Sequence, residues 1–250
     1  MGAILNNTAY EWETTVTSFD VDMYDRLKIS ALMKYQQEIG ERHLNVFGTT
    51  TEGMRKEQNL SFIFTKMNIL VHRLPKMGEN ITVRTWCSAL HGVRFTRNYQ
   101  LFDEKGQPLT EAKAEVTVLD LESRRIVRPT AIKGFDNFLY NDNLENNAEY
   151  PEKLGVEQTF SKESVRPVRF SDIDYNGHVN NTVYADMVID CLDADVLKMQ
   201  IKGFEINFLN EILPNETVKL SVEKGGKGQK VAGCVDNRQC FVAKIDFDSF

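Results

Sequence analysis

The chain has few histidines and cysteines and no excess of positive charge, and each shortage argues against a class of function. Its four histidines form no HExxH pair, so a metal site is not expected. Its four cysteines show no CxxC spacing, which is typical of reduced thiols in a cytoplasmic protein. The net charge of −6 argues against nucleic acid or an anionic membrane as the main partner.

Long hydrophobic runs are also missing. No apolar run approaches the roughly 20 residues that cross a bilayer, and the first residues have neither the charged start nor the apolar stretch of a signal peptide. Hydrophobic residues make up 42% and charged residues 26% of the 250 positions, as in ordinary soluble proteins. We therefore expect a soluble, cytoplasmic protein of one large domain or two of ordinary size.

One pattern occurs twice. In residues 18–27, and again in residues 170–179, an extended stretch ends in Asp-x-Asp and gives way to helical periodicity. The first helix is expected over residues 27–44, and Gly48 just beyond it is a typical helix stop. The second helix is indicated by three apolar residues spaced four apart: Val179, Val183 and Met187.

Each helix is followed by four segments rich in β-branched and aromatic residues, which predict strands. They are residues 60–72, 80–88, 93–103 and 109–121 in the first half, and 204–213, 217–223, 229–236 and 240–246 in the second. An antiparallel sheet with one apolar face needs a cover, and the helix is the obvious one. The predicted class is therefore α+β, with halves at residues 1–135 and 155–250 and an exposed linker at 136–154.

Three polar side chains, Asp174, Asn176 and His178, occupy alternate positions just before the second helix. In an extended segment they would share one face, at a helix N-terminus where unpaired N–H groups favour negative charge. Such a place could stabilise an oxyanion. The plainer alternative is a turn followed by a helix cap at Asn180 or Asn181.

Together these features resemble the acyl-acyl carrier protein (acyl-ACP) thioesterases, which are double hotdog proteins of plant plastids and bacteria. The plant enzymes carry a closely similar Asp-x-Asn-x-His-Val-Asn-Asn-x-x-Tyr string, matched here from Asp174 to Tyr184. A second match follows the family pattern in order through Thr85, Trp86, Gly92, Arg97, Asp103, Gly106 and residues 120–125. The resemblance implies a tandem hotdog, each half a long helix wrapped by an antiparallel sheet.

Two positions depart from the family pattern. Residues 114–116 read Ala-Glu-Val where the family usually has Ser-x-Trp, which leaves the details of the acyl pocket open. Ile212 stands where the plant enzymes have a cysteine, which argues against a cysteine nucleophile at that position.

The resemblance also implies a fourth catalytic residue, a glutamate that maps to Glu211. Glu211 interrupts a predicted apolar strand, where a carboxylate is costly unless it is hydrogen-bonded. We expect Glu211 or Asp174 to activate water, His178 to orient that water or protonate the leaving thiolate, and Asn176 to hold the carbonyl or the water. Under the repeat alignment the first half lacks this set, with Tyr24, Arg26 and His72 in place of Asn176, His178 and Glu211. The second half is therefore predicted to be catalytic and the first to hold the acyl chain.

The expected activity is hydrolysis of acyl-ACP to free fatty acid and carrier protein in fatty acid biosynthesis, without a metal or organic cofactor. The alternatives are an acyl-CoA thioesterase, a hotdog hydratase or dehydratase, and a non-catalytic acyl-binding module. Acyl chain preference stays open, and two such chains could form a homodimer. An acidic carrier protein needs a basic docking site, for which the candidates are Arg124, Arg125, Arg128 and Lys133.

Overall fold

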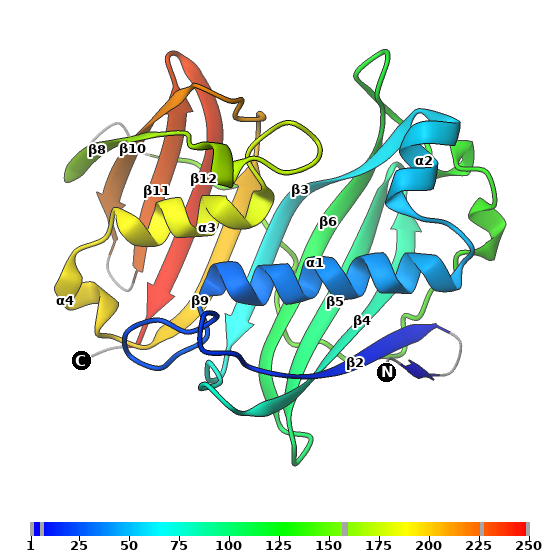
Figure 1. Cartoon of the computed structure of the whole chain (residues 1–250), viewed down its shortest axis with the longest axis horizontal. Coiled ribbons are helices and arrows are strands. Elements are labelled where there is room, and N and C mark those ends of the chain that lie inside the picture. Colours follow the sequence, from blue (N-terminus) through cyan, green and yellow to red (C-terminus); the bar gives the residue numbers. More distant parts are fainter. Residues whose placement is uncertain (1–2, 6–7, 157–159, 226–227, 249–250) are drawn as a thin grey trace.

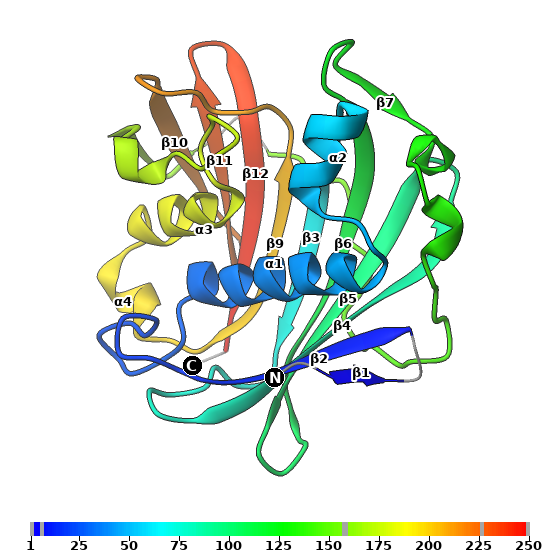
Figure 2. The ribbon, with the colours of Figure 1, turned by 45° about the vertical axis from the view of Figure 1, so that its right-hand side comes forward.

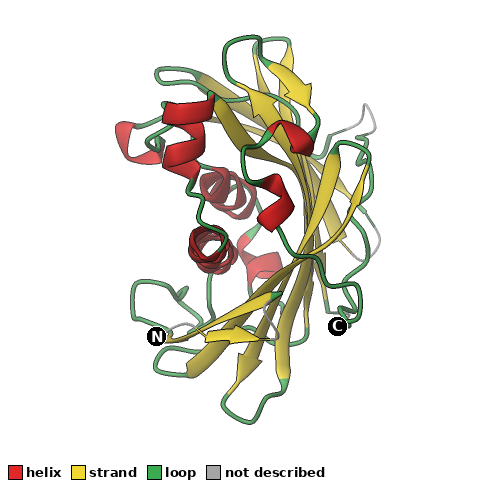
Figure 3. Cartoon of the chain, turned by 90° about the vertical axis from the view of Figure 1, so that its right-hand side faces the viewer, coloured by secondary structure: helices red, strands yellow, loops and turns green. Residues whose placement is uncertain are grey.

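The computed structural model describes residues 3–5, 8–156, 160–225 and 228–248. Twelve strands form one antiparallel sheet, and the long helices all lie on one of its faces (Figure 1). Figure 3, a view along the edge, shows the sheet curving around these helices. The strand order is β1-β2-β4-β5-β6-β3-β9-β12-β11-β10-β8, with β7 paired to β6. The two halves of the chain therefore meet where β3 pairs with β9.

The first half contains the predicted helix and strands, with one additional helix. Its elements are β1 (Ala3–Leu5), β2 (Ala9–Thr15), α1 (Ile29–Val46), α2 (Thr51–Gln58), β3 (Leu60–Val71), β4 (Asn80–His91), β5 (Arg94–Asp103), β6 (Pro108–Asp120), β7 (Arg125–Val127) and the 3-10 turns η1 (Pro129–Ala131) and η2 (Phe135–Asn137). Gly48 follows α1 with φ of +73°, the left-handed conformation that commonly ends a helix, as predicted. The unpredicted helix α2 is capped by Thr50, whose side chain accepts a hydrogen bond from the Gly53 N–H.

The second half repeats this arrangement with a shorter helix. Its elements are β8 (Lys162–Pro167), η3 (Phe170–Asp172), α3 (Asn181–Asp190), α4 (Ala194–Leu197), β9 (Ile201–Phe208), β10 (Thr217–Lys224), β11 (Gly228–Val235) and β12 (Arg238–Phe247). Strand β9 ends earlier than predicted, because the amides of Leu209 and Asn210 both bond to the Cys240 carbonyl and the chain turns away from the sheet. Glu211 therefore lies in a loop and not in a strand.

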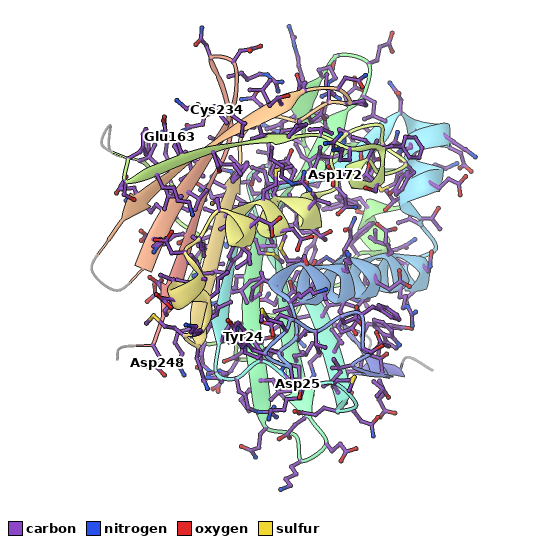
Figure 4. All side chains as sticks on the ribbon, turned by 60° about the vertical axis from the view of Figure 1, so that its left-hand side comes forward. Tyr24, Asp25, Glu163, Asp172, Cys234 and Asp248 are labelled. Carbon is purple, nitrogen blue, oxygen red and sulfur yellow. The ribbon has the colours of Figure 1, made fainter. Side chains whose placement is uncertain are left out.

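Backbone hydrogen bonds confirm the internal repeat. The bridge between Val21 and Leu27 before α1 has the same form as the bridge between Ile173 and Val179 before α3. These two segments lie on opposite sides of the helices α1 and α3, with Asp172 above them and Tyr24 below them in Figure 4.

One residue pairing inferred from the repeat was wrong. The amide of Leu27 bonds to Pro75 O, and the equivalent amide of Val179 bonds to Ile212 O, both at 2.8 Å. Pro75 is therefore equivalent to Ile212 in the repeat, and the residue equivalent to Glu211 is Leu74 and not His72. The same offset is seen where the two strands end, because the amides of His72 and Arg73 share the Leu109 carbonyl as those of Leu209 and Asn210 share the Cys240 carbonyl.

The predicted linker, residues 136–154, does not run free in solvent. It crosses the outer face of the sheet, where Asn147 donates to the buried Glu111 carboxylate through its backbone and its side chain. Glu111 also receives hydrogen bonds from Gln100 and from the His72 ring. The Asn-rich composition of residues 136–154 therefore reflects hydrogen bonding to the sheet. The division of the chain into two halves at this segment stays a prediction.

None of the helices in the described part of the chain combines the length and apolar character that a membrane-spanning helix needs.

Candidate active site

A tight turn, and not an extended segment, brings the three polar side chains before α3 together. The amide of Asp174 bonds to the His178 carbonyl at 3.0 Å, and the amide of Gly177 bonds back to Asp174 O at 3.0 Å. Gly177 has φ of +84°, a left-handed conformation that only glycine adopts without strain. The predicted alternation along a strand was wrong, because Asp and Asn side chains bond to nearby backbone and so favour turns.

The Asp174 carboxylate organises this turn. It accepts hydrogen bonds from the Asn176 amide at 2.7 Å and the Asn176 side chain at 3.2 Å. It also accepts a longer bond of 3.4 Å from the Asn180 side chain. With three donors around it, Asp174 fixes the position of Asn176 relative to the start of α3.

The remaining atom of the Asn176 carboxamide is free to act on a ligand. Its Nδ2 donates to Asp174, so its Oδ1 is an acceptor, and this oxygen is buried without a hydrogen-bond partner among the described residues. Asn176 lines the main cavity of the molecule. A buried carbonyl oxygen of this kind readily holds a water molecule.

His178 and Glu211 face each other across the mouth of this cavity. The distance from His178 Nε2 to Glu211 Oε1 is 3.8 Å, and the other Glu211 oxygen accepts a bond of 2.7 Å from Arg124. The Glu211 side chain is 36% exposed and lies in a loop, so only its placement in a strand was wrong. Arg238 donates to the Glu211 backbone carbonyl and to Glu216, which holds the loop in place.

The start of α3 is capped as the plainer alternative requires. Asn180 is the N-cap, and its side-chain oxygen accepts from the Thr182 amide at 2.9 Å. The amide of Val183 bonds to the Asn180 carbonyl. Two of the first three amides of the helix are thus occupied, which leaves the helix dipole as the main favourable interaction with negative charge.

A cavity of about 530 Å³ extends from these residues into the first half. It lies between α1 and the strands β3 to β6, and its apolar walls include Phe62, Phe64, Phe95, Val116 and Phe138. Figure 2 shows α2 and the loop before α3 at the same end of the molecule, where both contribute to the mouth. Residues of the second half and apolar residues of the first half therefore line one cavity across the junction of the halves.

Two polar residues of the cavity, Glu41 and Arg97, were not singled out as site residues by the sequence pattern. Arg124 was predicted only as a docking residue, and it contacts Glu211 directly. For Arg97 a signal existed, because residues 95, 97, 99 and 101 alternate in β5 and the arginine interrupts an otherwise apolar and aromatic face. For Arg124 the run of basic residues predicted a surface docking site and gave no indication of a contact with Glu211.

The described residues contain no group of three or more His, Cys, Asp or Glu side chains arranged to hold a metal ion. The four cysteines are free thiols, and burial raises the pKa of Cys191 to about 11. A neutral thiol at that position is a core residue and a poor nucleophile.

One residue of the basic cluster predicted for docking, Arg124, lines the cavity. Arg125, Arg128 and Lys133 are exposed on β7 and the segment that follows it. Arg124 differs from them, because its guanidinium turns toward Glu211. The cluster therefore divides into one residue at the site and three on the surface next to it.

Two family models match the chain: the acyl-ACP thioesterase N-terminal domain over residues 7–131 and the C-terminal domain over residues 156–239. Among curated relatives, the palmitoyl-acyl carrier protein thioesterase of Cuphea hookeriana is 23% identical over 80% of this chain and 51% of its own length. Oleoyl-acyl carrier protein thioesterase 2 of Arabidopsis thaliana is 23% identical over 84% of this chain and 61% of its own. The chain thus spans about half the length of the curated relatives it matches.

Two solved structures share the fold over nearly the whole chain. An acyl-ACP thioesterase from Bacteroides thetaiotaomicron has a TM-score of 0.88 at 18% identity, covering 97% of this chain and 98% of its own. The 12:0-ACP thioesterase from Umbellularia californica has a TM-score of 0.86 at 19% identity, covering 98% and 99%. The predicted α+β double hotdog is confirmed, and with both family models matched in order the chain belongs to the acyl-ACP thioesterase family.

Proposed function

We propose that this protein hydrolyses the thioester of an acyl-acyl carrier protein and releases a free fatty acid and the carrier protein. The observation that carries the proposal is the meeting of Asn176, His178 and Glu211 at the mouth of an apolar cavity. An acyl chain in that cavity would present its thioester carbonyl to these three side chains. The printed names of the relatives, which are acyl-ACP thioesterases, support the same reaction.

Each side chain has one chemical task in this reaction. A water held by Asn176 Oδ1 attacks the carbonyl carbon while Glu211 accepts its proton. The proton on Glu211 then passes to His178 Nε2, 3.8 Å away, the tetrahedral intermediate collapses, and the carbon–sulfur bond breaks. The thiolate leaves with that proton from His178, so both side chains return to their starting states. The products are a carboxylic acid and a thiol, so atoms and charge balance without a cofactor.

The choice of Glu211 as the base follows from hydrogen bonding. Asp174 is surrounded by three donors from Asn176 and Asn180, so its task is to hold Asn176 in place. Glu211 keeps one oxygen toward His178 at the cavity mouth, where a water can reach it. Asp174 is therefore a positioning residue, and Glu211 exchanges the proton.

The first half uses the equivalent positions for structure. Arg26, the counterpart of His178, donates to Asp22 in its own turn and to the carbonyls of Leu197 and Met199 in the other half. These bonds join the two halves at the end of the molecule opposite the site. The first half thus contributes the acyl pocket and a structural clamp.

Hydrolysis by a Glu211→Gln variant tests the proposal. We expect kcat on acyl-acyl carrier protein to fall by about 10²–10⁴-fold, the usual contribution of a general base. Glu163→Gln on the exposed strand β8 is the matched control and should leave kcat unchanged. Full activity of a folded Glu211→Gln protein would refute the assignment.

A separate experiment tests whether the substrate is carried by carrier protein or by CoA. It compares hydrolysis of the same acyl group attached to each of the two thiols. We expect a higher kcat/KM for the chain on carrier protein than on CoA, because the exposed basic residues Arg125, Arg128 and Lys133 follow Arg124, which lines the cavity, and would attract an acidic carrier. The reverse order would identify the protein as an acyl-CoA thioesterase.

A further inference from the structure

The cavity crosses the sheet from one strand to the next. A row of register partners lines it: Phe64 of β3 pairs with Val116 of β6, and Val116 pairs with Phe95 of β5. One step further across the sheet, Arg97 of β5 pairs with Cys87 of β4, and both residues line the cavity. The strand order β4-β5-β6-β3-β9 therefore gives the direction of the cavity, from the catalytic side at β9 to Cys87.

The length of this path limits the chain that fits. Phe208 of β9 lines the cavity on one side and Cys87 of β4 on the other, with β3, β6 and β5 between them. Four strand spacings of about 4.8 Å give a path of at most about 19 Å. An extended chain advances about 1.2 Å per bond, since the three backbone bonds of a residue span up to about 3.6 Å. A straight acyl chain of about 16 carbons would therefore fill the path.

At the far end of the cavity the predicted linker, residues 136–154, borders β4. The pairing of β2 with β4 ends one residue before Cys87. The Cys87 carbonyl accepts a hydrogen bond of 2.8 Å from the Asn141 amide of the linker. Tyr140, one residue earlier, stacks on Phe95 of β5 with ring centroids 6.5 Å apart. The linker thus continues the wall where strand pairing stops.

Phe138 of the linker forms part of the cavity wall. It is 6% exposed and lines the cavity together with Leu44 of α1. Its ring stacks on Phe47 at the end of α1, with centroids 5.2 Å apart, and meets Phe62 of β3 edge-on at 6.2 Å. The ring therefore bridges the C-terminal end of α1 and the sheet.

The charged group at this end already has partners. Arg97 Nη1 donates to His43 Nδ1 and to Thr85 Oγ1, both at 3.3 Å. Apolar surface at the same end comes from three side chains: Leu44, Phe95 and Phe138. Such a wall favours the methyl end of a plain acyl chain.

We propose that Phe138 sets the longest acyl chain that the protein accepts, so that the predicted linker is a specificity element. This rests on the proposed function. The methyl end of a chain of about 16 carbons would reach the end of the path, and a longer chain would have to displace the Phe138 ring. That displacement would disturb the packing on Phe47 and Phe62, which is unfavourable in a close-packed wall.

Hydrolysis of saturated acyl-acyl carrier proteins of increasing length measures this limit. We expect kcat/KM of the wild-type protein to be highest near about 16 carbons and to fall about tenfold or more when about two carbons are added. Phe138→Leu should move the maximum to a chain about two carbons longer, because the wall recedes. Phe138→Trp should move it about two carbons the other way, because the wall advances.

Phe135→Leu is the matched control. Phe135 stacks on Phe138 with centroids 5.8 Å apart and is not one of the residues that line the cavity, so the maximum should stay in place. The opposite directions expected for the two Phe138 variants distinguish a change of pocket length from a loss of stability. An unchanged maximum in both folded variants would overturn the proposal, and so would an equal shift in Phe135→Leu.

Binding of free fatty acids separates this proposal from the proposed reaction. Calorimetry over the same chain lengths should show affinity that increases up to the limit and no further, with the limit moved by Phe138→Leu and Phe138→Trp. Such a result without any thioester hydrolysis would uphold the role of Phe138 and refute the reaction. Hydrolysis with a limit that neither variant moves would uphold the reaction and refute the role of Phe138.

Discussion

Arg124 of the first half donates a hydrogen bond of 2.7 Å to Glu211 of the second half. Arg124 sits in the turn between β6 and β7 with φ of +56°, and Glu211 lies in the loop after β9. The bond crosses the cavity mouth, so each half supplies one side of the contact. The position of Glu211, the proposed base, therefore depends on a residue of the first half, which supplies the apolar walls of the cavity.

Replacing Arg124 with Gln should therefore affect turnover more than binding. The Glu211 carboxylate would lose the donor that holds it toward His178, and we expect kcat to fall about tenfold with little change in KM, a typical loss for a misplaced group. Arg125→Gln is the matched control, since the neighbouring side chain is exposed. Steady-state kinetics of both proteins make the comparison, and an equal loss of kcat in the two would contradict the role of Arg124.

Gly177→Ala should impair the site through backbone strain alone. At φ of +84° an alanine costs about 1–2 kcal/mol, while the added Cβ meets no atom within 4 Å. The turn that aligns Asn176 with His178 would shift, so we expect kcat to fall by at least tenfold. Gly92→Ala, at φ of +65° and also in open space, should lose similar stability and keep its kcat. If both variants keep full activity, the turn does not set the catalytic geometry.

Acid should destabilise the protein through His43. Burial, and then repulsion from Arg97, lower its folded-state pKa from 6.5 to about 3, so the unfolded chain binds the extra proton between these values. Stability from this group is complete above pH 6.5 and falls with decreasing pH by up to about 1.4 kcal/mol per unit. In His43→Gln, denaturant unfolding should show a correspondingly smaller slope over this range. An unchanged slope would mean that His43 is accessible to protons in the folded state.

Reversing the exposed basic residues should weaken carrier recognition. With Arg125, Arg128 and Lys133 changed to Glu, we expect KM for acyl-acyl carrier protein to rise about tenfold at low salt, and the difference to shrink at high salt. Turnover of a small uncharged acyl thioester should stay the same. Lys105→Glu, in the β5–β6 hairpin, is the control. A KM that is independent of these charges would place the docking surface elsewhere.

Removing the Glu111 carboxylate should release residues 136–154 from the sheet. Glu111 is 1% exposed and accepts from His72, Gln100 and Asn147. Glu111→Ala leaves the buried Gln100 donor unpaired and removes the acceptor shared by the exposed His72 and Asn147, and we expect the unfolding free energy to fall by about 1–3 kcal/mol. Proteolysis near Asn147 should also become faster. Stability equal to that of the parent would show that this segment does not depend on the sheet.

Much of the fold followed from local patterns. The apolar spacing of α1 and the β-branched runs of the strands were located correctly, because each depends on neighbours within a few positions. Strand β9 was extended too far, since the apolar pattern continues through Leu213 after hydrogen bonding has ended at Phe208. Periodicity reports which side chains favour burial, and it does not report where pairing stops.

The sequence by itself determined the repeat, the family resemblance and the presence of Asp174, Asn176 and His178 before the second helix. Only the tertiary structure showed how these groups are arranged. The turn closed by Asp174 and Gly177 supports the positioning role proposed for Asp174, and the contact between Arg124 and Glu211 joins residues that lie 87 positions apart. The orientation of Arg97 toward α1 also depends on how β5 packs. Long-range contacts of this kind depend on how two halves pack against each other, which local sequence patterns do not encode.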